Sequence, residues 1–189
     1  MLTDVPPRPN RAEYVRSDRL TLDPLNSVLP EIAKRLESAM KADRLRDVQG
    51  ACVEFLATAS GFYRVPKCGI RVLAARPLRI RERSSFELFG DYAPDTKLIR
   101  VWMRTAVRKE ITSYGTFLSM LCHEFCHHLD FQRFGFPDSW HTRGFYERAA
   151  TLYHHARDTV PKRLVWASVS GGRWRIDWPR TNRPGPRIR

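Results

Sequence analysis

Hydrophobic residues recur at helical spacing in several stretches of the chain. Residues 27–42 and 43–60 each carry apolar residues three and four positions apart, a pattern that predicts two helices with one buried face each. We expect Ser27 to cap the first helix, Pro30 to lie in its first turn and Gly61 to end the second helix. Both helices should pack against a sheet.

Two further helical patterns lie in the second half of the chain. The first is a stripe of apolar residues four apart from Phe117 to Leu129, and the second covers residues 142–157 with an apolar face of its own. Gly135 and Pro137, which favour turns, lie between them. The sequence therefore predicts two helices joined by a reversal of the chain.

Three shorter stretches with strand character lie between the first and second pairs of helices. They are residues 70–74, 85–92 and 97–103. In the last stretch, Ile99 and Val101 alternate with residues of different character, which predicts an edge strand whose two faces differ. Two helices, a small mixed or antiparallel sheet and two more helices predict the α+β class.

Charge is distributed unevenly along the chain. The net charge is +13, and residues 161–189 supply +7 of it with eight Arg or Lys and one Asp, whereas residues 81–160 are nearly neutral. We expect an irregular N-terminal segment at residues 1–22, a folded domain over residues 23–160 and a basic C-terminal extension. With 189 residues, of which 42% are hydrophobic, the chain can bury a core without disulfides.

The basic extension has two interpretations. Its Arg and Lys residues are interleaved with tryptophans such as Trp174, a combination that can neutralise phosphates and stack on bases, which predicts binding of DNA or RNA. Alternatively, residues 164–169 and 173–178 form a hairpin whose tryptophans cover the domain, with residues 179–189 as a solvated end. Steering of acidic protein substrates would explain the charge equally well.

Composition favours a cytoplasmic enzyme. Residues 1–14 have no apolar run and are rich in proline and charge, so no signal peptide is expected. No stretch approaches the ~18 apolar residues of a membrane-spanning helix. The four cysteines form no CxxC pair, so we expect reduced thiols that fill the core.

Residues 123–127 read His-Glu-Phe-Cys-His, which is the HExxH pattern. On a helix, residues four apart lie one turn above each other, so His123 and His127 can bind one metal ion from the same face. Glu124 is turned about 100° around the axis, where its carboxylate can act as a general base on an activated water. The pattern predicts one Zn²⁺ per chain and hydrolysis of an amide or ester bond. Two hydrogen-bonded structural histidines are the alternative.

A catalytic zinc ion normally has a third protein ligand. Asp130 shares the helical face but lies roughly 10 Å along the axis from His123, so it is expected to accept a hydrogen bond from the imidazole of His127 instead. A salt bridge or a helix-end charge is the alternative for Asp130. Glu147, on the following helix, points away from the apolar face. His141 lies one turn before Phe145 on that face and is the predicted third ligand, with a surface histidine as the alternative.

Several neighbouring residues could assist the reaction. His128 lies one turn beyond Glu124 and could help a proton leave, with a structural histidine as the alternative. A developing oxyanion needs a hydrogen-bond donor, and Tyr146, Arg143 or Tyr92 could supply it. The sequence does not choose among these three.

Together, HExxH and the segment His141-Thr142-Arg143-Gly144-Phe145 resemble the SprT-like zinc metallopeptidases, in which HExxH is followed by a helix that opens with H-x-x-x-F. The resemblance covers residues 85–157. It implies a minimal zincin-like fold, with His123, His127 and His141 as zinc ligands. It also implies that Glu124 is the catalytic glutamate.

The resemblance further implies that the strand at residues 97–103, with Ile99 and Val101, lies along the active-site cleft and receives extended substrate. SprT-like proteins often continue into a zinc ribbon, whereas no cysteine follows Cys126 in this chain. The leading hypothesis is a zinc metallopeptidase that cleaves extended segments of proteins, including proteins bound to nucleic acid. HExxH alone is shared with ImmA/IrrE-type proteases, which implies a regulatory protease that cuts a repressor. A non-catalytic nucleic-acid-binding protein with a structural metal site is the alternative from another class.

Overall fold

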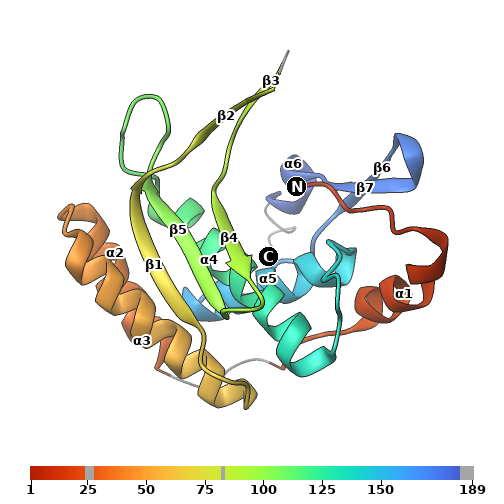
Figure 1. Cartoon of the computed structure of the whole chain (residues 1–189), viewed down its shortest axis with the longest axis horizontal. Helices are drawn as coiled ribbons and strands as arrows, with labels where there is room; N and C mark the ends of the chain where they lie inside the picture. Colours follow the sequence, from red (N-terminus) through yellow and green to blue (C-terminus); the bar gives the residue numbers. More distant parts are fainter. Residues whose placement is uncertain (24–27, 82–83, 184–189) are drawn as a thin grey trace, which may run out of the picture.

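Helices and short strands follow one another in groups along the chain in the computed structural model, which describes residues 1–23, 28–81 and 84–183 (Figure 1). The protein is a mixed α+β structure, as the sequence predicts. Its helices are α1 (Arg11–Arg19), α2 (Leu29–Lys41), α3 (Leu45–Tyr63), α4 (Tyr114–Leu129), α5 (Arg143–Ala156) and α6 (Trp178–Thr181). Its strands are β1 (Gly69–Ala75), β2 (Leu78–Arg81), β3 (Ser84–Glu87), β4 (Gly90–Ala93), β5 (Leu98–Arg104), β6 (Trp166–Val169) and β7 (Arg173–Ile176). Short helical turns are η1 (Arg8–Asn10), the π-helical η2 (Asp130–Phe134) and η3 (Ser170–Gly172).

The largest sheet has the strand order β1-β5-β4, so β5 lies in its middle (Figure 1). β5 pairs in parallel with β1, with Ile70 opposite Ile99 and Val72 opposite Val101, and antiparallel with β4. The prediction of an edge strand at residues 97–103 is therefore wrong. The alternation reflects one buried face of the sheet, because Ile99 and Val101 are completely buried. β1 and β4 are the edge strands instead.

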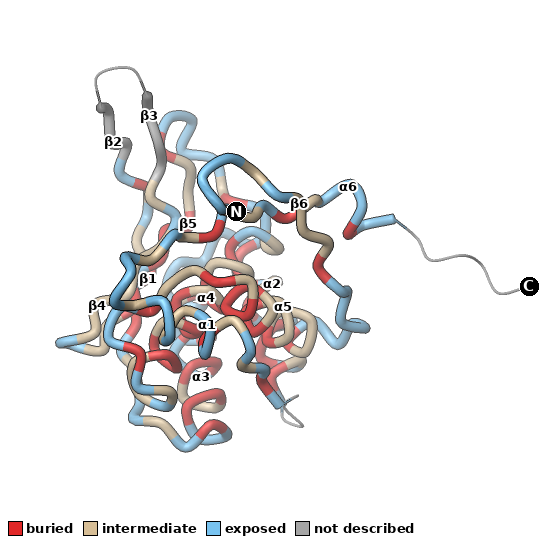
Figure 2. Tube along the Cα trace, turned by 90° about the vertical axis from the view of Figure 1, so that its right-hand side faces the viewer, coloured by how far each residue is buried: buried red, intermediate tan, exposed pale blue. Residues whose placement is uncertain are grey.

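Helices cover one face of this sheet. The inner residues of β1 and β5 contribute to the core with α3 and α4, whereas Arg71 and Arg100 on the other face are exposed. The rings of Tyr63 on α3 and Phe125 on α4 lie 6.3 Å apart, which joins the two helices beneath the sheet. α5 packs against α4, and α1 packs against α5 at the end of the molecule away from the sheet (Figure 1). Figure 2 shows that buried residues concentrate in α3, α4 and α5.

The helices expected at residues 27–42 and 43–60 are α2 and α3. Pro30 lies in the first turn of α2, as predicted, whereas the predicted cap Ser27 lies outside the described residues. α3 continues through Gly61 to Tyr63 and ends where Arg64 adopts a left-handed conformation with φ 54°. The prediction that Gly61 ends this helix is wrong by two residues, and the last residue of the helix, Tyr63, is buried in the core.

A tight reversal joins α4 to α5. α4 passes into η2, and Gly135 follows with a φ of 65°, a conformation that favours glycine. Thr142 then caps α5, because its side chain accepts a hydrogen bond from the backbone N–H of Phe145. The reversal predicted from Gly135 and Pro137 is confirmed, and it places the start of α5 beside α4.

The prediction of an irregular N-terminal segment at residues 1–22 is wrong, because this segment contains η1 and α1. Asp18 on α1 accepts hydrogen bonds from the Arg143 side chain and from the N–H of Gly144 at the start of α5. A Cβ at Gly144 would lie 2.5 Å from the backbone carbonyl oxygens of Ser17 and Asp18, so glycine permits this close approach. Apolar periodicity did not predict α1, because polar contacts attach this helix to α5.

The C-terminal strands β6 and β7 form the predicted antiparallel hairpin. The start of the chain extends this sheet, because the backbone N–H of Thr3 donates to the carbonyl of Trp174. Trp166 donates its indole N–H to Glu147 on α5, so the hairpin covers the domain. Of the expected solvated end at residues 179–189, the first part belongs to α6 and residues 184–189 lie outside the described residues. Within the described ranges, none of the helices has the length and apolar content that spanning a bilayer requires.

Candidate metal centre

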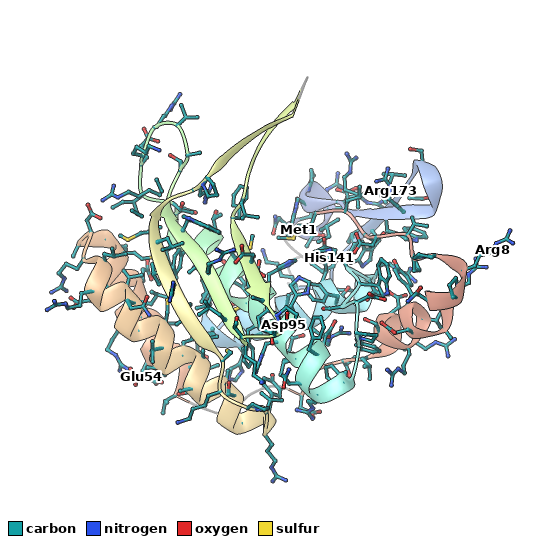
Figure 3. All side chains as sticks on the ribbon, in the orientation of Figure 1. Met1, Arg8, Glu54, Asp95, His141 and Arg173 are labelled. Atoms are coloured by element: carbon teal, nitrogen blue, oxygen red, sulfur yellow. The ribbon has the colours of Figure 1, made fainter. Side chains whose placement is uncertain are left out.

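Three histidines converge where α4 meets the start of α5. His123 and His127 come from successive turns of α4, and His141 immediately precedes the cap of α5. Their Nε2 atoms form a triangle with sides of 3.3 Å (His123 to His127), 3.1 Å (His123 to His141) and 3.2 Å (His127 to His141). In the part of the chain that the structure describes, this is the group of His, Cys, Asp or Glu side chains close enough to hold a metal ion. Figure 3 shows His141 near the middle of the molecule, between the sheet and the C-terminal hairpin.

The triangle has the dimensions of a tetrahedral zinc site. With Zn–N bonds of about 2.0–2.1 Å, two ligands of a tetrahedral ion lie about 3.3–3.4 Å apart. The three Nε2 atoms, 3.1 to 3.3 Å apart, can therefore all reach one common point. Three protein ligands leave the fourth direction for water or substrate, which is typical of catalytic zinc sites rather than closed structural ones.

Hydrogen bonds behind His127 orient its Nε2 toward this common point. Its Nδ1 lies 2.7 Å from Ser139 Oγ, and Ser139 donates its hydroxyl proton to Asp130 Oδ2 over 3.0 Å. Ser139 therefore accepts the hydrogen bond from Nδ1–H of His127, so the Nε2 carries a lone pair. Arg148 holds the other oxygen of Asp130 at 2.8 Å, and both side chains are completely buried.

The expected hydrogen bond from a ligand imidazole to Asp130 is thus relayed by Ser139. Sequence reasoning missed Ser139, because no sequence pattern marks this serine. In the structure its backbone is left-handed, with φ 45°, a conformation that residues other than glycine rarely adopt. Burial raises the pKa of Asp130 to about 6, although Arg148 and the hydrogen bond from Ser139 act in the opposite direction. Arg148 also donates to the backbone carbonyls of Ser17 and Leu20, so the support of His127 extends to α1.

Asp4 supports His141 in the same way. Its Oδ2 lies 3.1 Å from Nδ1 of His141 and accepts the backbone N–H of the same residue at 2.9 Å. Because a carboxylate accepts, Nδ1 carries the proton and Nε2 presents a lone pair. Burial pushes the pKa of Asp4 upward, but the hydrogen bonds from His141 outweigh this effect and lower it. Asp4 precedes His141 by 137 positions, so no local pattern could have predicted it.

The three Nε2 atoms are better placed to bind a cation than to form hydrogen bonds with one another. His127 and His141 direct lone pairs at each other over 3.2 Å and cannot hydrogen bond in these tautomers. Burial, with the charge of His141, lowers the pKa of His123 to about 3, and burial with the neighbouring histidines holds the pKa of His127 well below its usual value. Neither is protonated near neutral pH. Converging Nε2 atoms, two of them with lone pairs fixed by the partners of Nδ1, are ligands that Zn²⁺ accepts.

Glu124 follows His123 in the chain and lies on the side of α4 that faces β4. The residue is 4% exposed, and a Cβ on Gly90 of β4 would lie 2.9 Å from its Oε1. Burial, with a smaller contribution from Asp91, raises the pKa of Glu124 to about 8. A carboxyl group with a pKa near neutrality can both accept and return a proton during a reaction. The missing side chain of Gly90 lets the edge strand approach this group.

His128 is turned away from the triangle. Its Nδ1 lies 2.9 Å from the Tyr92 hydroxyl and its Nε2 2.8 Å from the carbonyl oxygen of Pro66, and its ring is completely buried. One turn beyond Glu124, it faces the sheet and binds β4 to α4. Both ring nitrogens of His128 have partners, which agrees with a structural histidine rather than with one that assists proton transfer. The same hydrogen bond involves the hydroxyl of Tyr92, one of the three donors that the sequence offered for the oxyanion.

Tyr146 and Arg143, the other donors expected at the site, lie at different distances from it. The ring of Tyr146 stacks on His141 with centroids 5.7 Å apart, while its hydroxyl donates to the backbone carbonyl of Leu2. Arg143 forms an ion pair with Asp18 on α1 at 2.8 Å and points away from the triangle. Arg143 is bound by α1, and the sequence did not predict the position of this helix.

Two further expectations concern residues outside the centre. Glu147, the rejected third ligand, accepts a hydrogen bond from Trp166 and lies apart from the triangle. Ile99 and Val101, expected to contact substrate, are completely buried in the core, because β5 is the central strand. The strand that meets the Glu124 side of α4 is β4.

No family model matches the chain, and no curated protein and no solved structure matches it either. What the site can do follows from its own geometry. A metal ion at the triangle would keep one open position, and the residue after the ligand His123 is Glu124, a carboxyl group of raised pKa that faces the edge strand β4. Such an arrangement can activate a water molecule against a carbonyl group.

Proposed function

We propose that the protein is a zinc-dependent metallopeptidase with a minimal zincin-like fold, similar to the SprT-like enzymes, and that it hydrolyses peptide bonds in proteins. The observation that carries the proposal is the triangle of three Nε2 atoms, 3.1 to 3.3 Å apart, on HExxH and the helix that follows it. Phe145, the last residue of the H-x-x-x-F segment, packs against all three imidazoles with ring centroids 4.6 to 5.1 Å away.

A zinc ion bound by these histidines would supply Lewis-acid polarisation of a water molecule and of the substrate carbonyl. Glu124 takes a proton from the water molecule while the water oxygen forms a bond to the carbonyl carbon of the substrate. Glu124 then returns this proton to the amine nitrogen as the C–N bond breaks. Burial of Glu124 favours its protonated form, which suits the second transfer. Ser139 and Asp4 hold the imidazoles of His127 and His141 in the tautomer that leaves Nε2 free.

β4 offers a binding place for the main chain of the substrate. It pairs with β5 on one side, and no strand of the described residues pairs with its other side. A peptide added at this edge would form main-chain hydrogen bonds and would pass the Glu124 carboxylate next to Gly90. Because strand addition requires an extended chain, unfolded or loop segments of proteins are the expected substrates.

The basic hairpin supports a second candidate, a non-catalytic nucleic-acid-binding protein with a structural metal. Residues 161–189 carry a net charge of +7, which suits phosphate contacts. Two of the tryptophans there are used for packing, however, because Trp166 lies on Tyr146 and Trp174 lies beneath the guanidinium of Arg143. A structural site has no use for Glu124 or an open position, so the metallopeptidase is preferred, with nucleic-acid-bound proteins among its substrates.

Replacing Glu124 by Gln tests the proposal. With one zinc bound per chain, the wild-type protein should cleave an unfolded protein such as denatured casein, and Glu124→Gln should lower the rate about 10²–10⁴-fold because the general base is lost. Zinc content, measured by elemental analysis, should stay unchanged. Glu147→Gln is the matched control, since the same change on α5 lies outside the triangle and should leave the rate and the zinc content intact.

The ligand set is tested by the same measurement of zinc. His141→Ala should lose the zinc that the Glu147 variant keeps. Zinc bound in the wild type, together with no cleavage of peptides or unfolded proteins by either the wild type or Glu124→Gln, would favour the non-catalytic candidate.

A further inference from the structure

A groove of about 850 Å³ begins at the metal ligand His123 and follows α4 and α5 toward the start of α4 and the end of α5. The C-terminal segment forms its other wall through residues of the hairpin and α6. Small residues widen it, namely Gly115, Ala149 and Ala150. Because His123 belongs both to the triangle and to the groove wall, whatever occupies this groove continues directly from the metal centre.

Exposed apolar side chains gather in this groove. Among its lining residues, Met1 is 46% exposed, Phe89 38%, Val160 85% and Trp178 44%. Large apolar side chains that stay in water at one place are typical of a binding surface. Figure 3 labels Met1 near His141, and Met1 lines the same groove as the metal ligand His123. Tyr146, whose ring centroid lies 6.0 Å from that of His123, and Met120, one turn before His123 on α4, also line the groove, so its part next to the metal suits a bulky apolar side chain.

The far end of the groove is basic. Arg157, Lys162 and His154 line it, and no Asp or Glu is found among the described lining residues. Arg157 donates to the Tyr153 hydroxyl and Lys162 to the Asn182 side chain, so these two partners leave their charges unneutralised. Burial lowers the pKa of His154, and the charges of Lys162 and Arg157 lower it further, which agrees with a cationic cluster.

One carboxylate outside the groove acts on this cluster. Glu37 on α2 contributes to the raised pKa of Arg157, after the hydrogen bond from Arg157 to Tyr153. Glu37 is itself ion-paired with Lys41 at 2.8 Å, so its charge is shared. The groove therefore keeps a positive end that an acidic group of a ligand can use.

Helix geometry gives the distance between the two ends. A Cβ on Gly115 would lie 3.2 Å from the Tyr153 hydroxyl and 3.8 Å from Nη1 of Arg157, so Gly115 marks the basic end on α4. Gly115 precedes His123 by eight residues, which is about 12 Å of helix. An extended peptide advances about 3.3 Å per residue and covers this distance in three to four residues.

We propose that this groove binds the substrate polypeptide on one side of the scissile bond and selects a bulky apolar side chain next to the metal and a carboxylate three to four residues farther along. The inference rests on the proposed peptidase function, whose substrate class it names. Complementarity in both halves of the groove, apolar near His123 and cationic at Arg157 and Lys162, supports an acidic, extended peptide as the occupant.

Binding of defined peptides to the zinc-loaded Glu124→Gln protein tests this inference without turnover. The probes are fluorescein-labelled decapeptides with a central Phe, with two Asp residues three and four positions before or after it, and their Asn counterparts. By fluorescence anisotropy, one acidic peptide should bind about five-fold more tightly than its Asn counterpart, as expected for partly exposed charge pairs. Exchanging Phe for Ala should weaken binding about ten-fold or more.

Charge variants locate the effect. Adding Arg157→Gln and Lys162→Gln should remove the preference for the acidic peptide, whereas Lys34→Gln and Arg46→Gln, an equal charge change on α2 and α3, should keep it. That control pair lines a separate surface depression together with Glu54, which Figure 3 labels, and neither residue lines the groove.

Equal binding of acidic and Asn peptides, or a preference that survives loss of Arg157 and Lys162, would overturn the inference. If the preferences appear as expected but the zinc-loaded wild type cleaves none of the peptides, the groove stands and the peptidase function fails.

Discussion

His127 and His141 are held in equivalent ways by two supports that differ in burial. Behind His127, the ion pair of Asp130 and Arg148 is 0% exposed on both sides, and Ser139 connects it to the imidazole. Behind His141, the side chains of Asp4 and His141 are 40% and 31% exposed. Both supports fix a tautomer, but the cost of breaking them differs, because an unpaired charge is far less stable in the core than in water.

The difference separates folding from metal binding. The buried support ties α4 to α5 and α1 through Arg148, so it contributes to the fold whether or not a metal is bound. The exposed support acts at the rim of the centre, where water can replace Asp4. We expect changes in the first support to alter both stability and zinc affinity, and changes in the second to alter mainly zinc affinity.

The largest effect is expected for Asp130→Ala. It leaves the Arg148 charge buried without its carboxylate and should lower the free energy of unfolding by about 3–5 kcal/mol, measured by urea denaturation of the zinc-free protein. The double variant Asp130→Leu with Arg148→Met removes both charges and should recover part of this loss. A loss below about 1 kcal/mol for Asp130→Ala would show that burial does not distinguish the two supports.

Ser139→Ala should have the next largest effect. It removes the acceptor of His127 Nδ1 and a donor to Asp130, and should weaken zinc binding about 10–100-fold in a competition titration with a chelator. The loss of two buried hydrogen bonds should also lower the free energy of unfolding by about 1–3 kcal/mol. Ser38→Ala, the same change on α2, serves as the control. Unchanged zinc affinity would contradict the relay through Ser139.

Asp4→Asn tests the exposed support. Zinc affinity should fall about ten-fold, because Asn accepts the hydrogen bond from His141 without the negative charge that strengthens the ligand. The free energy of unfolding should change by less than about 1 kcal/mol, since the carboxylate is partly exposed. Asp138→Asn, which changes a carboxylate bonded to Asn10, should leave zinc affinity unchanged. A stability loss as large as that of Asp130→Ala would remove the contrast between the supports.

The smallest effect is expected for Arg100→Gln. This residue forms an ion pair with Asp91 on the exposed face of the sheet, with side chains 47% and 26% exposed. Its loss should change the free energy of unfolding by about 0.5 kcal/mol or less. The measurement is the same urea denaturation, and this variant gives the smallest change in the free energy of unfolding. A loss above about 2 kcal/mol would mean that the exposure of an ion pair does not predict the change in free energy of unfolding when the pair is removed.

Much of the fold was accessible from local patterns. α2, α3, α4 and α5 have apolar faces at helical spacing, and the reversal between α4 and α5 is announced by Gly135 and Pro137. The central position of β5 was not predicted, because the alternation of residue types along a strand indicates which residues are buried but not which strands lie on either side. α1 was missed because it attaches through Asp18 and the close approach at Gly144 rather than through an apolar stripe.

For the candidate metal centre, the sequence by itself determined the three converging histidines and the glutamate beside them. Their spacing is set by the pitch of one helix and by the face of the next, which are local properties of the chain. The tertiary structure alone decided that Asp4 and the pair of Asp130 and Arg148 orient these ligands and that β4 supplies the free edge. These contacts join residues up to 137 positions apart, where no periodicity connects the partners and only packing brings them together.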